Sequence, residues 1–120
     1  MKKQDRTYIH FLEDILLSLQ RIQEYISDYD FIKFKHDYKT VDAVIRNFEI
    51  IGEAAKNLPG KIKKRYPKIP WEEMYRLRNR VSHEYFGIDY DIIWDIITNY
   101  LPDNEESIVD LLNKEKGTKH

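Results

Sequence analysis

The sequence predicts an all-α protein, folded as a bundle of four or five helices. Two long segments carry apolar residues alternately three and four positions apart, which is the spacing of one face of a helix. No segment shows the sustained alternation of apolar and polar residues that a strand requires. The turn-forming pair Pro59-Gly60 follows the second periodic segment and predicts the end of a helix there.

The first two predicted helices are the longest. One covers residues 5–27 and contains neither Pro nor Gly, so about six turns can form without a break. The other begins near Thr40, and its small residues Gly52, Ala54 and Ala55 would let a second backbone approach closely. We expect these helices to pack antiparallel through two apolar stripes, made of Tyr8, Leu12, Ile15, Leu19, Ile22 and Ile26 and of Val41, Val44, Phe48, Ile51, Ala55 and Leu58.

The rest of the chain predicts shorter elements. Residues 28–37 form a connection, and residues 61–68 form a basic cluster that is either a solvated loop, the commoner case, or a contact for an RNA backbone. A third helix spans residues 71–85 and stops at Gly87, and a fourth follows the cap Asp89. Pro102 should break or kink that helix before a last short one. The helical domain is thus expected over residues 1–113, with residues 114–120 as a mobile tail.

Composition excludes several classes of protein. The 120 residues are 42% hydrophobic and 34% charged, a globular balance, and the formal net charge of −1 means that nucleic-acid binding would need a local basic patch. The absence of Cys rules out disulfides, thiolate metal sites and a thiol nucleophile. No apolar run approaches the roughly 18 residues of a membrane span, so we expect a cytoplasmic protein.

The third predicted helix carries the residues best suited to chemistry. Arg76, Asn79, Arg80 and His83 fall along one polar face at helical spacing. Such a face suits RNA cleavage without a metal, because an imidazole can move protons near neutral pH and a guanidinium can hold the phosphate as it gains charge. The plainer alternative is a solvated helix face, with His83 favoured simply by its place near a helix C-terminus.

Arg78 and His83 present a geometric difficulty. Five residues turn an ideal helix by about 140°, so one copy of the helix cannot easily direct both side chains at one phosphate. Either the last turn before Gly87 is distorted, or two copies of the helix meet and share a site. The second option agrees with the prevalence of two-fold symmetric dimers.

Several motifs resemble the HepT-like toxin ribonucleases of the HEPN superfamily. Residues 78–85, Arg-Asn-Arg-Val-Ser-His-Glu-Tyr, match that family's R-x4-H-x-Y pattern, and residues 48–56, residues 69–71, residues 87–89 and Trp94 are also similar. The resemblance implies a HEPN-type homodimer that is a metal-independent endoribonuclease without a cofactor. It implies that Arg78 and His83 are catalytic, with Asn79 and Arg80 in support. It also implies an MntA-type minimal nucleotidyltransferase antitoxin that transfers AMP to Tyr85.

Three hypotheses about function follow. The first is a toxin ribonuclease of a type VII toxin–antitoxin system, acting on RNA. The second is a catalytically silent HEPN module that binds a nucleotidyltransferase partner or nucleic acid. The third is a plain helical dimerisation protein. Arg78, His83 and Tyr85 occurring together favour the first over the second.

Overall fold

The computed structural model describes residues 3–83 and 89–117, except the side chains of residues 3–7 and 78–83. Every element in this part of the chain is a helix, which confirms the predicted all-α class. The elements are α1 (Lys3–Tyr25), α2 (Phe31–His36), α3 (Tyr38–Asn57), α4 (Gly60–Arg65), α5 (Trp71–His83), α6 (Tyr90–Asp95), the π-helical segment η1 (Ile96–Tyr100) and α7 (Leu101–Gly117).

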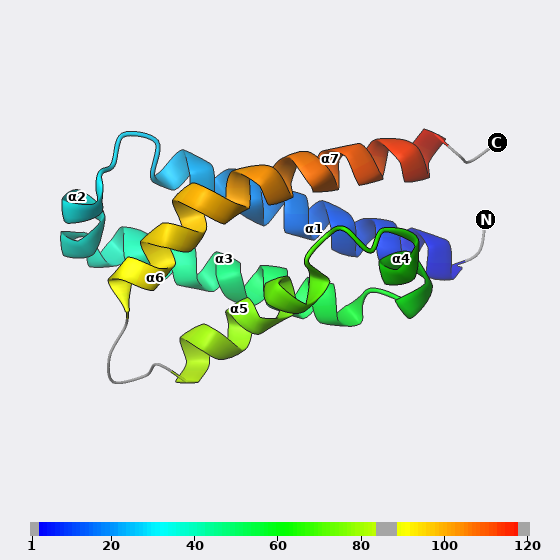
Figure 1. Cartoon of the computed structure of the whole chain (residues 1–120), viewed down its shortest axis with the longest axis horizontal. Coiled ribbons are helices and arrows are strands. Elements are labelled where there is room, and N and C mark those ends of the chain that lie inside the picture. The colour runs from blue at the N-terminus through cyan, green and yellow to red at the C-terminus, as the bar shows by residue number, and fades with distance from the viewer. Residues whose placement is uncertain (1–2, 84–88, 118–120) are drawn as a thin grey trace.

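The four longest helices form the bundle (Figure 1). Helices α1 and α3 run antiparallel, as their stripes predicted, and α7 lies along α1 while α5 packs on α3. The short helices α2 and α4 lie at opposite ends of the bundle. The motif-bearing α5 therefore rests on one side of a scaffold built from α1, α3 and α7.

The two apolar stripes form the core. Leu12, Ile15, Leu19 and Ile22 of α1 are completely buried, and the stripe of α3 is buried along its whole length. The small residues Gly52, Ala54 and Ala55 are buried as well. Fully burying a Leu, Ile or Phe side chain stabilises the fold by about 1.5–3 kcal/mol relative to exposure, so these stripes supply much of the stability.

Helix α6, η1 and α7 follow one another without a connecting loop, so of the expected break or kink at Pro102 the break is wrong. Proline has no backbone N–H and its ring crowds the carbonyl four residues earlier. Here Pro102 falls just after the wider π turn, in which the Leu101 N–H donates to the Ile96 carbonyl. We call the continuous segment of α6, η1 and α7 the rod. We infer that the π turn accommodates Pro102, because hydrogen bonds in a π-helix span five residues rather than the four of a regular α-helix.

Two segments differ from the sequence prediction. Residues 61–68 were expected more often to form a loop, but helix α4 occupies most of that cluster and buries Ile62 completely. The tail was expected from Lys114, but α7 continues to Gly117 and Glu115 is buried. In α4 the side chain of Ile62 packs into the core, and in α7 the side chain of Glu115 pairs with Arg65 across the bundle. We attribute the helical structure of both segments to these contacts.

Asp89 caps α6, as predicted. Its side chain accepts a hydrogen bond from the Ile92 N–H at 3.1 Å. Trp94 of the same helix packs its ring 5.2 Å from that of Phe34, which is fully buried in α2. The contact ties α6 to the end of the bundle. None of the described helices is long and apolar enough to span a membrane.

Candidate functional site

Helix α5 is anchored through its N-terminal half. The indole Nε1 of Trp71 donates to the Tyr66 carbonyl at 3.0 Å, and Glu72 and Glu73 complement the helix dipole in the first turn. Met74 and Leu77 are buried against the bundle, as predicted. The second half of α5, residues 78–83, contains the start of the motif.

The motif positions are placed by the backbone alone. Arg78, Asn79, Arg80 and His83 all belong to the α-helical backbone of α5, whereas their side chains and the whole of Tyr85 lie outside the described residues. On a regular helix positions 78 and 83 differ by about 140° around the axis. Helical backbone through His83 therefore keeps the two positions on different sides of α5.

A groove of about 830 Å³ lies between α5 and the rod. Its apolar wall includes Met74, Leu77, Ile96 and Leu101. Arg76, which is exposed, borders the same groove. Because positions 76 and 83 are seven residues apart, they lie on nearly the same side of α5. Position 83 is nine residues, or about half a turn around the axis, from Met74 of the apolar wall, so it lies toward the Arg76 edge of the groove and not over its floor.

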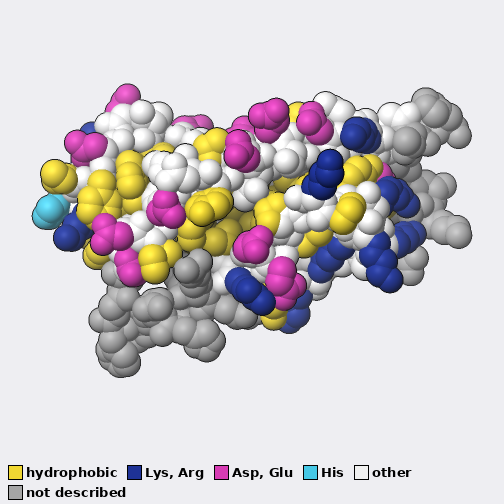
Figure 2. Space-filling view, viewed as in Figure 1, with side chains coloured by type: hydrophobic (Ala, Val, Ile, Leu, Met, Phe, Trp, Pro, Cys, Tyr) yellow, Lys and Arg dark blue, Asp and Glu magenta, His cyan; other side chains and the backbone are white. Residues whose placement is uncertain are grey.

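The opposite wall of the groove is the π-helical segment. Tyr100 lines it and is 58% exposed. The acidic residues Glu73 and Asp95 lie at the groove as well. Figure 2 shows hydrophobic side chains along the middle of this face, flanked by charged ones. An apolar floor with a rim of mixed charge, from Arg76, Glu73 and Asp95, suits a protein surface better than a polyanion.

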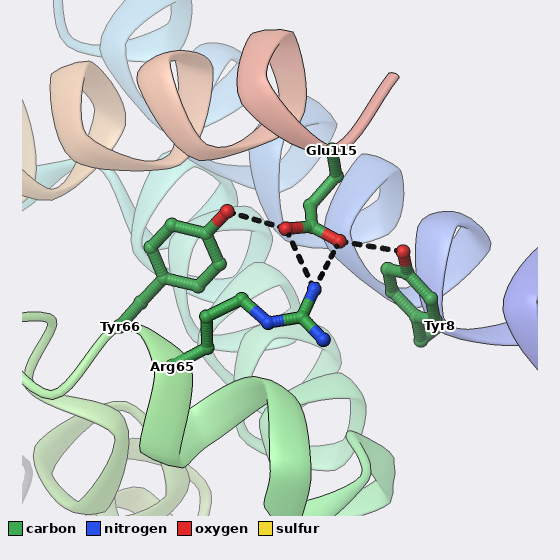
Figure 3. A network of polar contacts seen from close by, with 4 residues as sticks. All are labelled: Tyr8, Arg65, Tyr66 and Glu115. Carbon is green, nitrogen blue, oxygen red and sulfur yellow. Dashed lines mark hydrogen bonds and ion pairs between the residues drawn. The ribbon is translucent and has the colours of Figure 1, made fainter. Parts of the chain in front are cut away.

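A second polar site lies at the α4 end of the bundle (Figure 3). Glu115 of α7 is almost fully buried and accepts hydrogen bonds from Tyr8 at 2.6 Å and from Tyr66. One guanidinium nitrogen of Arg65 reaches both carboxylate oxygens of Glu115, at 2.9 and 3.0 Å. The cluster joins α1, the α4 end and α7, which are far apart in the sequence.

The electrostatics of this cluster favour ionised Glu115. Burial alone would raise its pKa, but hydrogen bonds from Tyr66, Tyr8 and Arg65 and the charge of Arg65 together outweigh burial and lower the pKa. Burial and the hydrogen bond to Glu115 raise the pKa of Tyr66, so its phenol stays protonated and donates. These hydrogen bonds satisfy the buried carboxylate, so the arrangement is a structural network.

Sequence reasoning did not identify this network, although one signal was present. Glu115 lies seven residues after Ile108 and four after Leu111, on the buried stripe of the last helix. A carboxylate on an apolar stripe requires a partner, because an unpaired buried charge is very costly. The partners themselves are 50 and 107 residues away and could not be read from local sequence.

His36 is exposed, and its Nδ1 lies 2.9 Å from the Ile32 carbonyl of its own helix. The described residues contain no cluster of three or more His, Cys, Asp or Glu side chains that could hold a metal ion.

Comparison with known proteins identifies the group to which these features belong. Residues 15–111 match the family described as "Ribonuclease HepT-like". The chain is 45% identical over 107 residues to "Putative RNase MJ0127" of Methanocaldococcus jannaschii, covering 89% of this chain and 88% of that protein. It is 42% identical over 97 residues to "Probable ribonuclease HepT" of Thermococcus cleftensis, covering 81% and 88% of the two chains. No solved structure matches.

Proposed function

Since the chain belongs to the HepT-like ribonuclease family, we propose that it is a ribonuclease and that Arg78 and His83 carry the cleavage. The observation that carries this proposal is the family match over residues 15–111, which includes the whole motif from Arg78 to Tyr85. Two relatives whose names describe ribonucleases also support the proposal.

The reaction needs no metal. The ribose 2′-oxygen loses its proton and attacks the adjacent phosphorus, the bond from phosphorus to the 5′-oxygen breaks, and the 5′-oxygen takes up a proton. His83 serves these proton transfers, because an imidazole can give or accept a proton near neutral pH. Arg78 holds the phosphate oxygens as they gain negative charge, with Asn79 and Arg80 in support.

The active form is a homodimer. Positions 78 and 83 face different sides of one regular α5, so two copies of α5 could complete one site that a single copy cannot. The groove beside α5 has an apolar floor, and exposed Tyr100 at its edge offers a contact of the kind enriched at interfaces. Light scattering should give twice the mass of one chain, and a monomer at micromolar concentration would contradict this assembly.

The regulatory partner is an MntA-type nucleotidyltransferase antitoxin. Tyr85, two residues after His83, attacks the α-phosphorus of ATP with its hydroxyl oxygen, releasing pyrophosphate and a proton and leaving an AMP ester. The added phosphodiester brings negative charge to a site that must accept anionic RNA, so cleavage should fall. The protein would thus be the toxin of a two-component system in the cytoplasm.

Labelled RNA incubated with purified full-length protein tests the catalytic proposal. His83→Ala should lower the cleavage rate by about 10²–10⁴-fold, the usual contribution of a proton-transfer group, and Arg78→Ala should lower it strongly as well. Arg21→Ala is the matched control, because Arg21 is an exposed arginine of α1, whereas α5 packs mainly on α3. Full activity in either motif variant would contradict the assignment, and an inactive wild-type protein would favour the catalytically silent alternative.

Mass spectrometry tests the regulation separately. Incubation with the partner, ATP and magnesium should add the mass of AMP at Tyr85. Tyr85→Phe should retain much of its cleavage activity but resist neutralisation. An adduct on a different residue, or no adduct, would remove Tyr85 from the scheme.

A further inference from the structure

Positive charge is concentrated at one end of the molecule. Six Lys or Arg residues and no Asp or Glu fall between residues 56 and 68, while the chain as a whole carries a net charge of −1. Figure 2 shows dark blue side chains gathered over the end where α4 lies and more of the acidic side chains over the rest of this face. We call the surface of Lys56, Lys61, Lys63, Lys64 and Lys68 the basic end.

Helix α4 presents this charge from a fixed position. Its Ile62 is completely buried, and Arg65 and Tyr66 at its C-terminal end are bound to Glu115 of α7. Lys61 and Lys64 are exposed on the same short helix. The lysines therefore extend from an anchored element, which limits the ordering entropy that binding would cost.

The lysines of the basic end remain available to a ligand. Glu115 is engaged by Arg65, and within the described part of the chain no carboxylate pairs with any of the five lysines. Helix-dipole stabilisation accounts for Lys63 and Lys64 in the last turn of α4, but not for Lys61 in its first turn or for Lys68 beyond its end. The cluster is larger than helix stability requires.

The basic end is connected to the motif by α5. Trp71 at the start of α5 is bonded to the Tyr66 carbonyl beside α4, and 12 residue steps of about 1.5 Å separate Trp71 from His83 by about 18 Å. A stacked strand advances about 3.4 Å along its axis per phosphate, so it covers that length in roughly five nucleotides. An RNA longer than this can occupy both places at once.

We propose that the basic end binds the phosphate backbone of the RNA substrate at a site separate from the cleavage motif. The inference rests on the proposed function for the identity of the ligand. Lysine ammonium groups bind phosphates as point charges without reading bases, so this surface adds affinity for long RNA rather than sequence selectivity.

The test compares two triple variants of equal charge. Lys61→Ala/Lys64→Ala/Lys68→Ala removes exposed lysines of the basic end, and Lys33→Ala/Lys35→Ala/Lys39→Ala removes exposed lysines at the opposite end, on α2 and the start of α3. Fluorescence anisotropy measures binding of labelled RNAs of about three and about fifteen nucleotides, only the longer of which spans the roughly five-nucleotide distance. His83→Ala serves as the background, so that the RNA stays intact, and circular dichroism checks that each variant is folded.

The triple variant of the basic end should bind the long RNA about tenfold more weakly than the His83→Ala background. It should also reduce the slope of log K against log salt by about 2, because each of three lost single-strand phosphate contacts contributes about 0.7. Binding of the short RNA should not change, and with His83 restored KM for long RNA should rise while kcat stays the same. Unchanged affinity and salt slope for long RNA would overturn the proposal and leave an acidic protein as the candidate ligand. An equal loss in the opposite-end variant would also overturn it, since net charge alone would then explain the effect.

The two proposals fail in distinguishable ways. A wild-type protein that cuts no RNA contradicts the proposed function, whereas binding to the basic end is still measured directly. A wild-type protein that cuts RNA while the basic-end variant binds long RNA normally contradicts only the second site.

Discussion

Replacing Glu115 with alanine should lower the free energy of unfolding by about 3 kcal/mol, because three elements lose their common acceptor. The Glu115 carboxylate is 3% exposed and bonded to Tyr8, Arg65 and Tyr66. Hydrogen bonds to a charged group contribute about 1.5–3 kcal/mol each, and removing one partner of a buried ion pair costs about 3–5 kcal/mol. The lower end of that range applies here, because Arg65 is 51% exposed and can regain water.

The effect should be visible in thermal unfolding. An unfolding entropy of about 2.1 cal/mol/K per residue gives about 0.25 kcal/mol/K for 120 residues, so 3 kcal/mol corresponds to a fall in Tm of about 12 °C. Circular dichroism should be recorded at one protein concentration, because any dimer makes Tm depend on concentration. Glu106→Ala, an exposed glutamate of the same helix, should change stability by less than about 0.5 kcal/mol.

Single removals of the donors refine the test. Tyr66→Phe and Tyr8→Phe should each destabilise the protein by roughly 1–2 kcal/mol, and their effects should not add to that of Glu115→Ala. A loss below about 1 kcal/mol for Glu115→Ala, or full additivity with the tyrosine variants, would refute the account of Glu115 as the shared acceptor.

Three further outcomes are expected. Because the pKa of Glu115 is lower in the folded protein, its contribution to the free energy of unfolding is present above about pH 4.5 and is lost as pH falls through the folded pKa. In urea titrations at several pH values, Glu115→Gln should therefore reduce the loss of stability at acid pH. Phe48→Ala should cost about 3–5 kcal/mol in chemical denaturation because Phe48 is 1% exposed, whereas Tyr38→Ala at 71% exposure should change little, and equal effects would contradict the assigned core. RNA cleavage should survive EDTA, and its loss would reveal a metal requirement.

The bundle could be predicted from sequence because helix periodicity is a local property. The stripes of α1 and α3 identify their buried faces, and Asp89 marks the start of α6 through its capping carboxylate. The resemblance of the chain to HepT-like ribonucleases is confirmed by the family match over residues 15–111. The roles of Arg78, His83 and Tyr85 stay predictions, because their side chains lie outside the described residues.

Secondary structure could not be predicted from neighbouring residues alone at Pro102 and in residues 61–68. Proline normally breaks a helix, but Pro102 follows a π turn, and the rod from α6 to α7 continues through it. A run of lysines more often predicts a solvated loop, but α4 is stabilised as a helix by the buried Ile62 and by the contacts of Arg65 and Tyr66 with α7.

The sequence by itself determined the helical class and the buried faces, since each depends on residues within a few turns of one another. It also determined the family, through motifs spread over residues 48–94. Only the tertiary structure decided that α4 forms a helix, that α7 continues past Lys114 and that a groove lies beside α5. For α4 and α7 the physical reason is the pairing of Glu115 with donors up to 107 residues away. For the groove it is the tertiary placement of α5 beside α6, η1 and α7. A buried charge in an apolar stripe shows that partners must exist, but their identity depends on which surfaces the packed helices bring together.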